Sequence, residues 1–285
     1  MNVFKTGFLL ALLTVLLVFI GQLLGGTQGA TIAFAFALAF NFLAYWFSDK
    51  LVLAMYRAKP LSESEAPQAY RVVREIASRS HIPMPKLYVI STITPNAFAT
   101  GRSPKHASVA VTSGLLQLMN EEELKGVLAH ELSHVKNRDT LVMTIAAALA
   151  GAIMYLARMA EWGLWFGGSN RNRENRGSGV AQVVVLLLVA ILAPLAAMLI
   201  QLAISRTREY SADDSGAHLA GTPYGLASAL EKLEQAARNH PLPNANPATA
   251  HLFIVNPLSA GAIASLFSTH PPIAERIRRL RHMRL

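Results

Sequence analysis

Long apolar stretches constrain this chain more than any other feature of its sequence. Residues 7–24 and residues 30–47 contain no charged side chain, and the glycine-rich link between them is also uncharged. Each run is long enough to cross the hydrocarbon core of a bilayer as one helix. We therefore predict an uncleaved helical hairpin in the membrane. A cleaved signal peptide is the alternative for the first run, but its length and the second run that follows disfavour it.

Two further apolar stretches follow in the second half of the chain, at residues 141–162 and 180–204. Only 15% of all residues are charged, well below the ~25% that is usual for soluble domains. We predict an α-helical integral membrane protein with four apolar membrane helices. The second pair either crosses the bilayer or only dips into it, and the arginines within residues 170–176 weigh slightly against full translocation.

The basic residues predict the orientation of the first hairpin. Lys5 precedes it, and Lys50, Arg57 and Lys59 follow it. By the positive-inside rule, both the N-terminus and the segment after the hairpin lie in the cytoplasm. The net charge of +9 then fits an anionic lipid surface better than nucleic acid. The chain has no cysteine, which excludes disulfides and thiolate metal ligands.

A His-Glu-x-x-His motif lies between the two pairs of apolar stretches. Residues four positions apart share one face of a helix, so His130 and His134 direct two imidazoles at one point. This ligand pair suits Zn²⁺, and Glu131 beside it is a candidate general base of a metalloprotease. Asn120 and Glu123 have the spacing of a capping box, which predicts a helix start just before the motif. A chance match is the alternative, and this helical context weakens it.

A catalytic zinc site needs a third protein ligand, with the fourth position left for water. Glu209 and Asp213 are spaced four positions apart, so Glu209 can bind the metal while Asp213 accepts the outer N–H of a ligand histidine. Taken alone, the pair beside its neighbouring arginines reads better as a surface salt-bridge cluster. Topology favours the ligand, because two apolar stretches separate it from His134 and return the chain to the same side. Asp139 either caps the next helix or supports the metal site.

Together these motifs resemble the HtpX family of membrane-bound zinc metalloproteases, relatives of the CAAX prenyl proteases. The resemblance covers nearly the whole chain and rests on the apolar stretches, His130-Glu131-x-x-His134, Glu209-x-x-x-Asp213, Asn96-Ala97-Phe98 and Thr269-His270-Pro271-Pro272. It implies a gluzincin-type α+β protease domain in the cytoplasm with one Zn²⁺ per subunit. It also implies a heat-shock-linked endopeptidase of the bacterial inner membrane that cleaves misfolded or damaged membrane proteins.

The predicted domain organisation follows from this resemblance and from the apolar stretches. Residues 1–48 form a transmembrane hairpin, and residues 49–140 form the first part of the cytoplasmic protease domain. Residues 141–204 form the second transmembrane or membrane-dipping hairpin, and residues 205–285 form the second part of the protease domain. The expected partners are unfolded or membrane protein substrates, the lipid bilayer and other membrane quality-control proteases, with no nucleic acid.

The predicted chemistry is metal-assisted peptide hydrolysis, in which Zn²⁺ acidifies a water molecule and Glu131 accepts its proton. His270 is the candidate donor to the oxyanion formed on the scissile carbonyl; a histidine that merely precedes a helix is the alternative. Asn96, Ala97 and Phe98 are candidates for an edge strand that binds substrate backbone, and an ordinary turn is the alternative there.

Two other functions compete with this prediction. One is a protease that acts on prenylated or otherwise modified C-termini, as the CAAX relatives do. With four apolar stretches, this chain is short for the large membrane chamber of those relatives. The other is a non-catalytic membrane scaffold, which does not require the complete set of His130, Glu131, His134 and Glu209.

Overall fold

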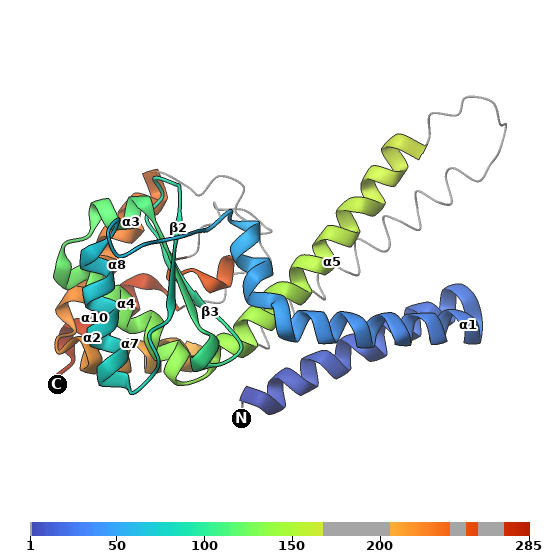
Figure 1. Cartoon of the computed structure of the whole chain (residues 1–285), viewed down its shortest axis with the longest axis horizontal. Helices are drawn as coiled ribbons and strands as arrows, with labels where there is room; N and C mark the ends of the chain where they lie inside the picture. The colour runs from blue at the N-terminus through green and yellow to red at the C-terminus, as the bar shows by residue number, and fades with distance from the viewer. Residues whose placement is uncertain (1, 168–205, 240–248, 256–270) are drawn as a thin grey trace.

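A computed structural model of the chain describes residues 2–167, 206–239, 249–255 and 271–285. These residues form a body of helices around a small sheet, from which two long apolar helices extend (Figure 1). The extended helices are α1 (Asn2–Met55) and α5 (Asp139–Gly167). The described part of the chain is mostly helical, as predicted. The predicted fourth apolar stretch, at residues 180–204, lies outside the described residues.

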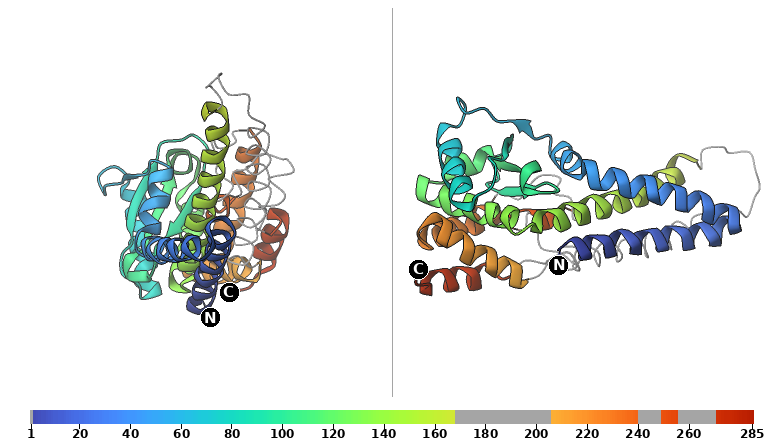
Figure 2. Two further views of the ribbon diagram at one scale, coloured as in Figure 1. Left: turned by 90° about the vertical axis from the view of Figure 1, so that its right-hand side faces the viewer. Right: turned by 60° about the horizontal axis from the view of Figure 1, so that its bottom comes forward.

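The helix α1 folds back on itself as a helical hairpin (Figure 2, right); its place in the membrane stays a prediction. The bend lies at Gly25 and Gly26, whose backbone dihedrals are non-helical, with φ of 58° at Gly26. Near the bend the two halves touch through glycines: a Cβ placed on Gly21 would lie 2.5 Å from the carbonyl oxygen of Gly29. Farther along, Asn41 donates to the hydroxyl of Thr14 at 2.9 Å. Small residues and polar bonds of this kind join helices where lipid surrounds them.

The surface of α1 is apolar along most of its length. Its exposed side chains include Phe4, Phe8, Phe34, Phe36 and Phe42, a pattern that water disfavours and lipid accepts. Within the described residues, the one helix long and apolar enough to span a membrane is Gly25–Met55, and the shorter apolar helices are Thr6–Phe19 and Asp139–Gly151. The four membrane helices therefore stay a prediction.

The sheet has four strands in the order β1-β2-β4-β3. The strands are β1 (Lys59–Pro60), β2 (Lys86–Ile90), β3 (Ala97–Thr100) and β4 (Ser108–Thr112). Strands β2 and β4 are parallel in the centre, and β1 and β3 pair antiparallel at the two edges. The segment predicted as an edge strand or a turn is thus an edge strand.

The helix α4 (Glu121–Lys136) carries the His-Glu-x-x-His motif and lies at the centre of the body. Its predicted capping box is confirmed: the Asn120 side chain accepts from Glu123 N at 2.9 Å, and the Glu123 carboxylate accepts from Asn120 N at 3.0 Å. The helices around it, together with the short helices of the body, are α2 (Pro67–Ser80), α3 (Ser113–Leu118), α7 (Arg206–Ala220), α8 (Tyr224–Asn239), α10 (Ile273–His282), η1 (Pro104–His106) and η2 (Ala250–Leu252).

Close helix packing brings the motif to its partners. A Cβ placed on Gly216 of α7 would lie 3.0 Å from the Cα of His130, so the two helix backbones nearly touch there. Likewise, a Cβ on Gly126 of α4 would lie 2.4 Å from the backbone nitrogen of Leu226 in α8. Because only glycine permits such approaches, the side chains of α7 that face α4 are held against the histidines.

Two apolar contacts join the extended helices to the rest. The first half of α5 packs against both halves of α1 in a buried cluster that includes Leu9, Leu13, Ala44, Ile145 and Leu149. Where α1 ends, Tyr56 lies in an aromatic group with Phe98 of β3 and Phe253, with ring centroids 4.9 to 5.9 Å apart. The edge strand β3 is therefore packed directly against the end of the hairpin.

Candidate metal centre

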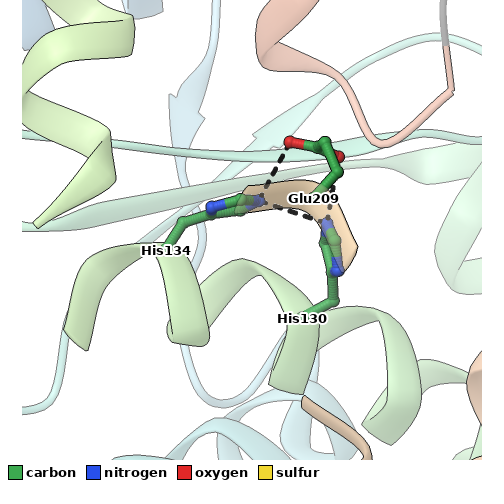
Figure 3. A group of neighbouring side chains, drawn as sticks. All are labelled: His130, His134 and Glu209. Atoms are coloured by element: carbon green, nitrogen blue, oxygen red, sulfur yellow. Dashed lines mark hydrogen bonds and ion pairs between the residues drawn. The ribbon is translucent and has the colours of Figure 1, made fainter. Parts of the chain in front are cut away.

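Three buried side chains converge at the contact between α4 and α7 (Figure 3). The two Nε2 atoms of His130 and His134 are 3.3 Å apart. The carboxylate of Glu209 lies 3.5 Å from His134 Nε2 and 3.8 Å from His130 Nε2. Ligands held at about 2.0–2.1 Å by a tetrahedral zinc ion lie about 3.3–3.4 Å from one another. The spacing and donor chemistry of these three residues therefore fit a zinc ion.

The ring of His130 is oriented by Asp213, which is itself paired with Arg276. Its Nδ1 lies 2.9 Å from Asp213 Oδ1, which leaves Nε2 to face Glu209. Arg276 donates to both oxygens of that aspartate, from Nη2 at 2.6 Å and from Nε at 2.9 Å. Burial by itself raises the pKa of Asp213, but the charge and hydrogen bonds of Arg276 outweigh it and hold the pKa below its usual value. Burial lowers the pKa of His130, and the Arg276 charge lowers it further.

The ring of His134 has a looser set of partners of the same kind. Its Nδ1 lies 3.3 Å from Asp139 Oδ2, and Asp139 Oδ1 lies 3.6 Å from Arg208 Nη1. Asp139 is also the first residue of α5; of the two roles that the sequence left open, the structure shows the contact with His134. Burial lowers the pKa of His134, but the bond to Asp139 and the charges of Glu209 and Glu131 outweigh it and raise the pKa to about 9.

Glu131 lies between the histidines and the sheet edge. Its Oε2 accepts a hydrogen bond from the backbone N–H of Ala99 in β3 at 2.8 Å. Burial, together with the nearby charge of Glu209, raises the pKa of this carboxyl to about 8. A carboxyl group that titrates near neutral pH can accept and release a proton in turn, as a general base must.

The outer edge of β3 is occupied by the chain itself. Ala97 O accepts from the backbone N–H of Ile254 at 3.1 Å, and the Asn96 side chain donates to Val255 O at 2.8 Å. The ring of Phe98 is buried in the aromatic group described above. Of the three residues predicted to bind substrate, Ala97 alone directs a backbone carbonyl away from the sheet, because Asn96 O is bonded to Thr112 N in the β4 ladder and the pairing alternates along the strand.

Other residues of the site were not found by sequence reasoning, or lie beyond the described structure. Arg276 was missed, because it lies in a run of arginines on α10 that reads as a solvated basic helix. Arg208 was missed as well, although it directly precedes Glu209. His270, the predicted oxyanion donor, lies outside the described residues. The signals that the sequence did carry were the two i, i+4 pairs, because both members of each pair lie on one helix face.

Comparisons with known proteins agree with this geometry. Residues 63–284 match the profile of Peptidase family M48. The chain is 59% identical to "Protease HtpX homolog" of Syntrophobacter fumaroxidans over 98% of this chain and 99% of that protein. It is 57% identical to the protein of the same name from Pyrococcus furiosus, over 97% of this chain and 94% of that protein.

A solved structure shares the fold. The crystal structure of S. mikatae Ste24p superposes with a TM-score of 0.52 and 20% sequence identity, covering 97% of this chain. The chain spans 63% of the length of that structure. At this identity the likeness concerns the arrangement of the elements and not their chemistry.

Proposed function

Because this chain belongs to peptidase family M48, we propose that it is a zinc-dependent endopeptidase that hydrolyses peptide bonds of misfolded or damaged membrane proteins. Its likeness to HtpX proteins over nearly the full chain confirms the family predicted from the motifs. A membrane-associated metalloprotease is what the family and the apolar helix support directly. Zinc as the metal, the substrate class and the role in stress are our proposals.

One observation carries the proposal: His130, His134 and Glu209 converge at the spacing of tetrahedral zinc ligands, with Glu131 beside them. When bound, the ion would polarise the scissile carbonyl and acidify water. Glu131 Oε2 is held by Ala99 N, which leaves Oε1 as the atom that takes the proton from water. Asp213 and Asp139 would keep the outer nitrogen of each histidine protonated, so that each Nε2 is free to bind the metal.

The substrate is proposed to run beside β3. Its backbone would pair with the carbonyl of Ala97, which is the outward acceptor next to Glu131 in the described structure. An extended peptide adds to a free sheet edge through such backbone bonds. Ile254 occupies that acceptor here, so a bound peptide would take its place. The role of His270 as oxyanion donor stays a prediction.

The proposed location is the bacterial inner membrane, with several membrane passes and the active site on the cytoplasmic side. The hairpin of α1 and its exposed phenylalanines support the membrane part. The basic residues at both ends of the hairpin support the cytoplasmic part.

The change Glu131→Gln tests this function. The amide keeps the size of the side chain but cannot accept a proton, while the three ligand side chains are untouched. We expect zinc binding to persist and the rate of hydrolysis to fall about 10²–10⁴-fold. The measurement is turnover of an unfolded membrane protein, in detergent, at matched zinc content.

Glu121→Gln is the matched control. Glu121 lies on the same helix but pairs with Arg71 at the surface, with 56% of its side chain exposed. This change is expected to leave turnover unchanged, because exposed ion pairs contribute little. Near-normal turnover in Glu131→Gln would remove the proposed general base, and absence of zinc from the wild-type protein would remove the proposed metal.

A further inference from the structure

We propose that Arg276 is a positioning residue that holds the metal ligand His130 and, at the same time, Ile254, which covers the edge of β3. This proposal rests on the proposed function of the site. The other arginines of α10 lie in solvent: the side chains of Arg278 and Arg281 are 68% and 56% exposed. Arg276 is 0% exposed and is among the largest fully buried side chains of the described residues. A guanidinium in that position requires partners for its donors.

On the metal side, Arg276 fixes the aspartate behind His130. Two of its nitrogens bind the two oxygens of Asp213 in a fork, which is the geometry that holds a carboxylate in one orientation. Asp213 Oδ1 is at once 2.6 Å from Arg276 Nη2 and 2.9 Å from His130 Nδ1. The aspartate therefore cannot rotate without breaking the fork, and the imidazole is oriented through it.

At the edge of the sheet, the remaining guanidinium nitrogen of Arg276 contacts the segment of residues 249–255. Arg276 Nη1 donates to the carbonyl oxygen of Ile254 at 3.1 Å. The N–H of the same residue donates to Ala97 O at the edge of β3, also at 3.1 Å. One side chain thus holds both Asp213 and the residue that occupies the acceptor of the edge strand.

The planar fork, rather than the charge alone, makes this double contact. A lysine ammonium carries the same charge, but it is a single point and cannot bind both carboxylate oxygens and a carbonyl on another side. The geometry therefore predicts that Arg276→Lys keeps the charge balance of the buried pair but loosens His130 and Ile254 together. A residue that served only to neutralise Asp213 would be replaced by lysine without such an effect.

The experiment compares Arg276→Lys with Arg278→Lys, an exposed arginine on the same helix, in the full-length protein in detergent. Three quantities are measured: zinc affinity by competition with a chelator, the visible absorption of the Co²⁺-substituted protein, and hydrogen exchange of the Ile254 amide. For Arg276→Lys we expect zinc affinity to fall about 10–100-fold. We also expect an altered Co²⁺ spectrum and faster exchange at Ile254. Arg278→Lys should match the wild type in every measurement.

Wild-type zinc affinity, spectrum and Ile254 exchange in Arg276→Lys would overturn the proposal, as would a variant that only melts at a lower temperature. The exchange measurement needs neither metal nor turnover, so it decides the role of Arg276 even if the wild-type protein proves not to be a zinc protease. If the lysine variant does not fold, the double change Asp213→Asn with Arg276→Gln removes both buried charges. Unchanged Ile254 exchange in that variant would also overturn the proposal, because Arg276, not Asp213, holds the Ile254 carbonyl.

Discussion

His130 and His134 lie one helical turn apart and are each backed by an aspartate and then an arginine, but the two sets differ in tightness. In the His130 triad (His130, Asp213, Arg276) the contacts are 2.9 and 2.6 Å. In the His134 triad (His134, Asp139, Arg208) the matching contacts are 3.3 and 3.6 Å. Asp139 is the aspartate of the looser set. Arg276 is fully buried, whereas Arg208 retains 15% exposure.

The difference follows from the elements that carry each triad. The His130 triad joins α4, α7 and α10, three helices that pack on one another within the body. The His134 triad draws its aspartate from the first residue of α5, where the chain leaves the body toward the apolar helices (Figure 1). Burial and Arg276 depress the pKa of His130, while the partners of His134 raise its pKa to about 9. The His130 triad thus holds its histidine ring in one orientation. The His134 triad stabilises the protonated, charged form of its histidine.

The largest effect that tests this comparison is expected for Asp213→Asn. The change leaves the buried Arg276 without its charged partner, and breaking such a pair costs about 3–5 kcal/mol. Loss of the histidine's support should also reduce metal affinity or activity, near the upper end of the usual 10–100-fold range. Chemical denaturation and zinc competition measure the two effects. Wild-type values in both would show that the charge of Asp213 neither stabilises the fold nor supports the metal ligand.

Asp139→Asn should have a smaller effect of the same kind. Its contacts to His134 and Arg208 are longer than the matching contacts of Asp213, so neutralising Asp139 removes weaker interactions. We expect metal affinity to fall about 10-fold, at the lower end of the range for such partners. The same competition assay measures it. A loss equal to or greater than that of Asp213→Asn would contradict the ranking of the two triads.

The smallest expected effect is the pH dependence of the metal-free protein. The pKa of His134 is raised to about 9 in the folded state, against an ordinary histidine value of 6.5. Because the folded state binds this proton more tightly, the resulting stability is present below pH 6.5 and lost as the pH rises to 9. Urea denaturation in chelator across this window measures it. Asp139→Asn should flatten the curve, and an unchanged curve in that variant would show that Asp139 is not what holds the proton on His134.

How much of this site the sequence could predict depends on the range of each interaction. The motif helix was predictable because Asn120, Glu123 and the two histidines act within one helix, where spacing alone decides which side chains share a face. The bend of α1 was equally local, because glycines interrupt two apolar runs that are each long enough for a bilayer. The ligand Glu209 could also be predicted from the sequence, because Glu209 and Asp213 have the same helical spacing as the two histidines.

Only the tertiary structure determined which side chains on different helices and strands meet. The arginines of α10 look alike in sequence, and only the packing of α10 against α7 and α8 buries Arg276 beside Asp213, 63 positions away. In the same way, Ile254 bonds to Ala97 where the neighbouring Phe253 packs on Phe98. A local pattern fixes which face a residue takes on its own helix or strand. Which of several equivalent side chains meets a distant partner is fixed by how those elements pack. Burial selects Arg276, each of whose three guanidinium nitrogens finds an acceptor.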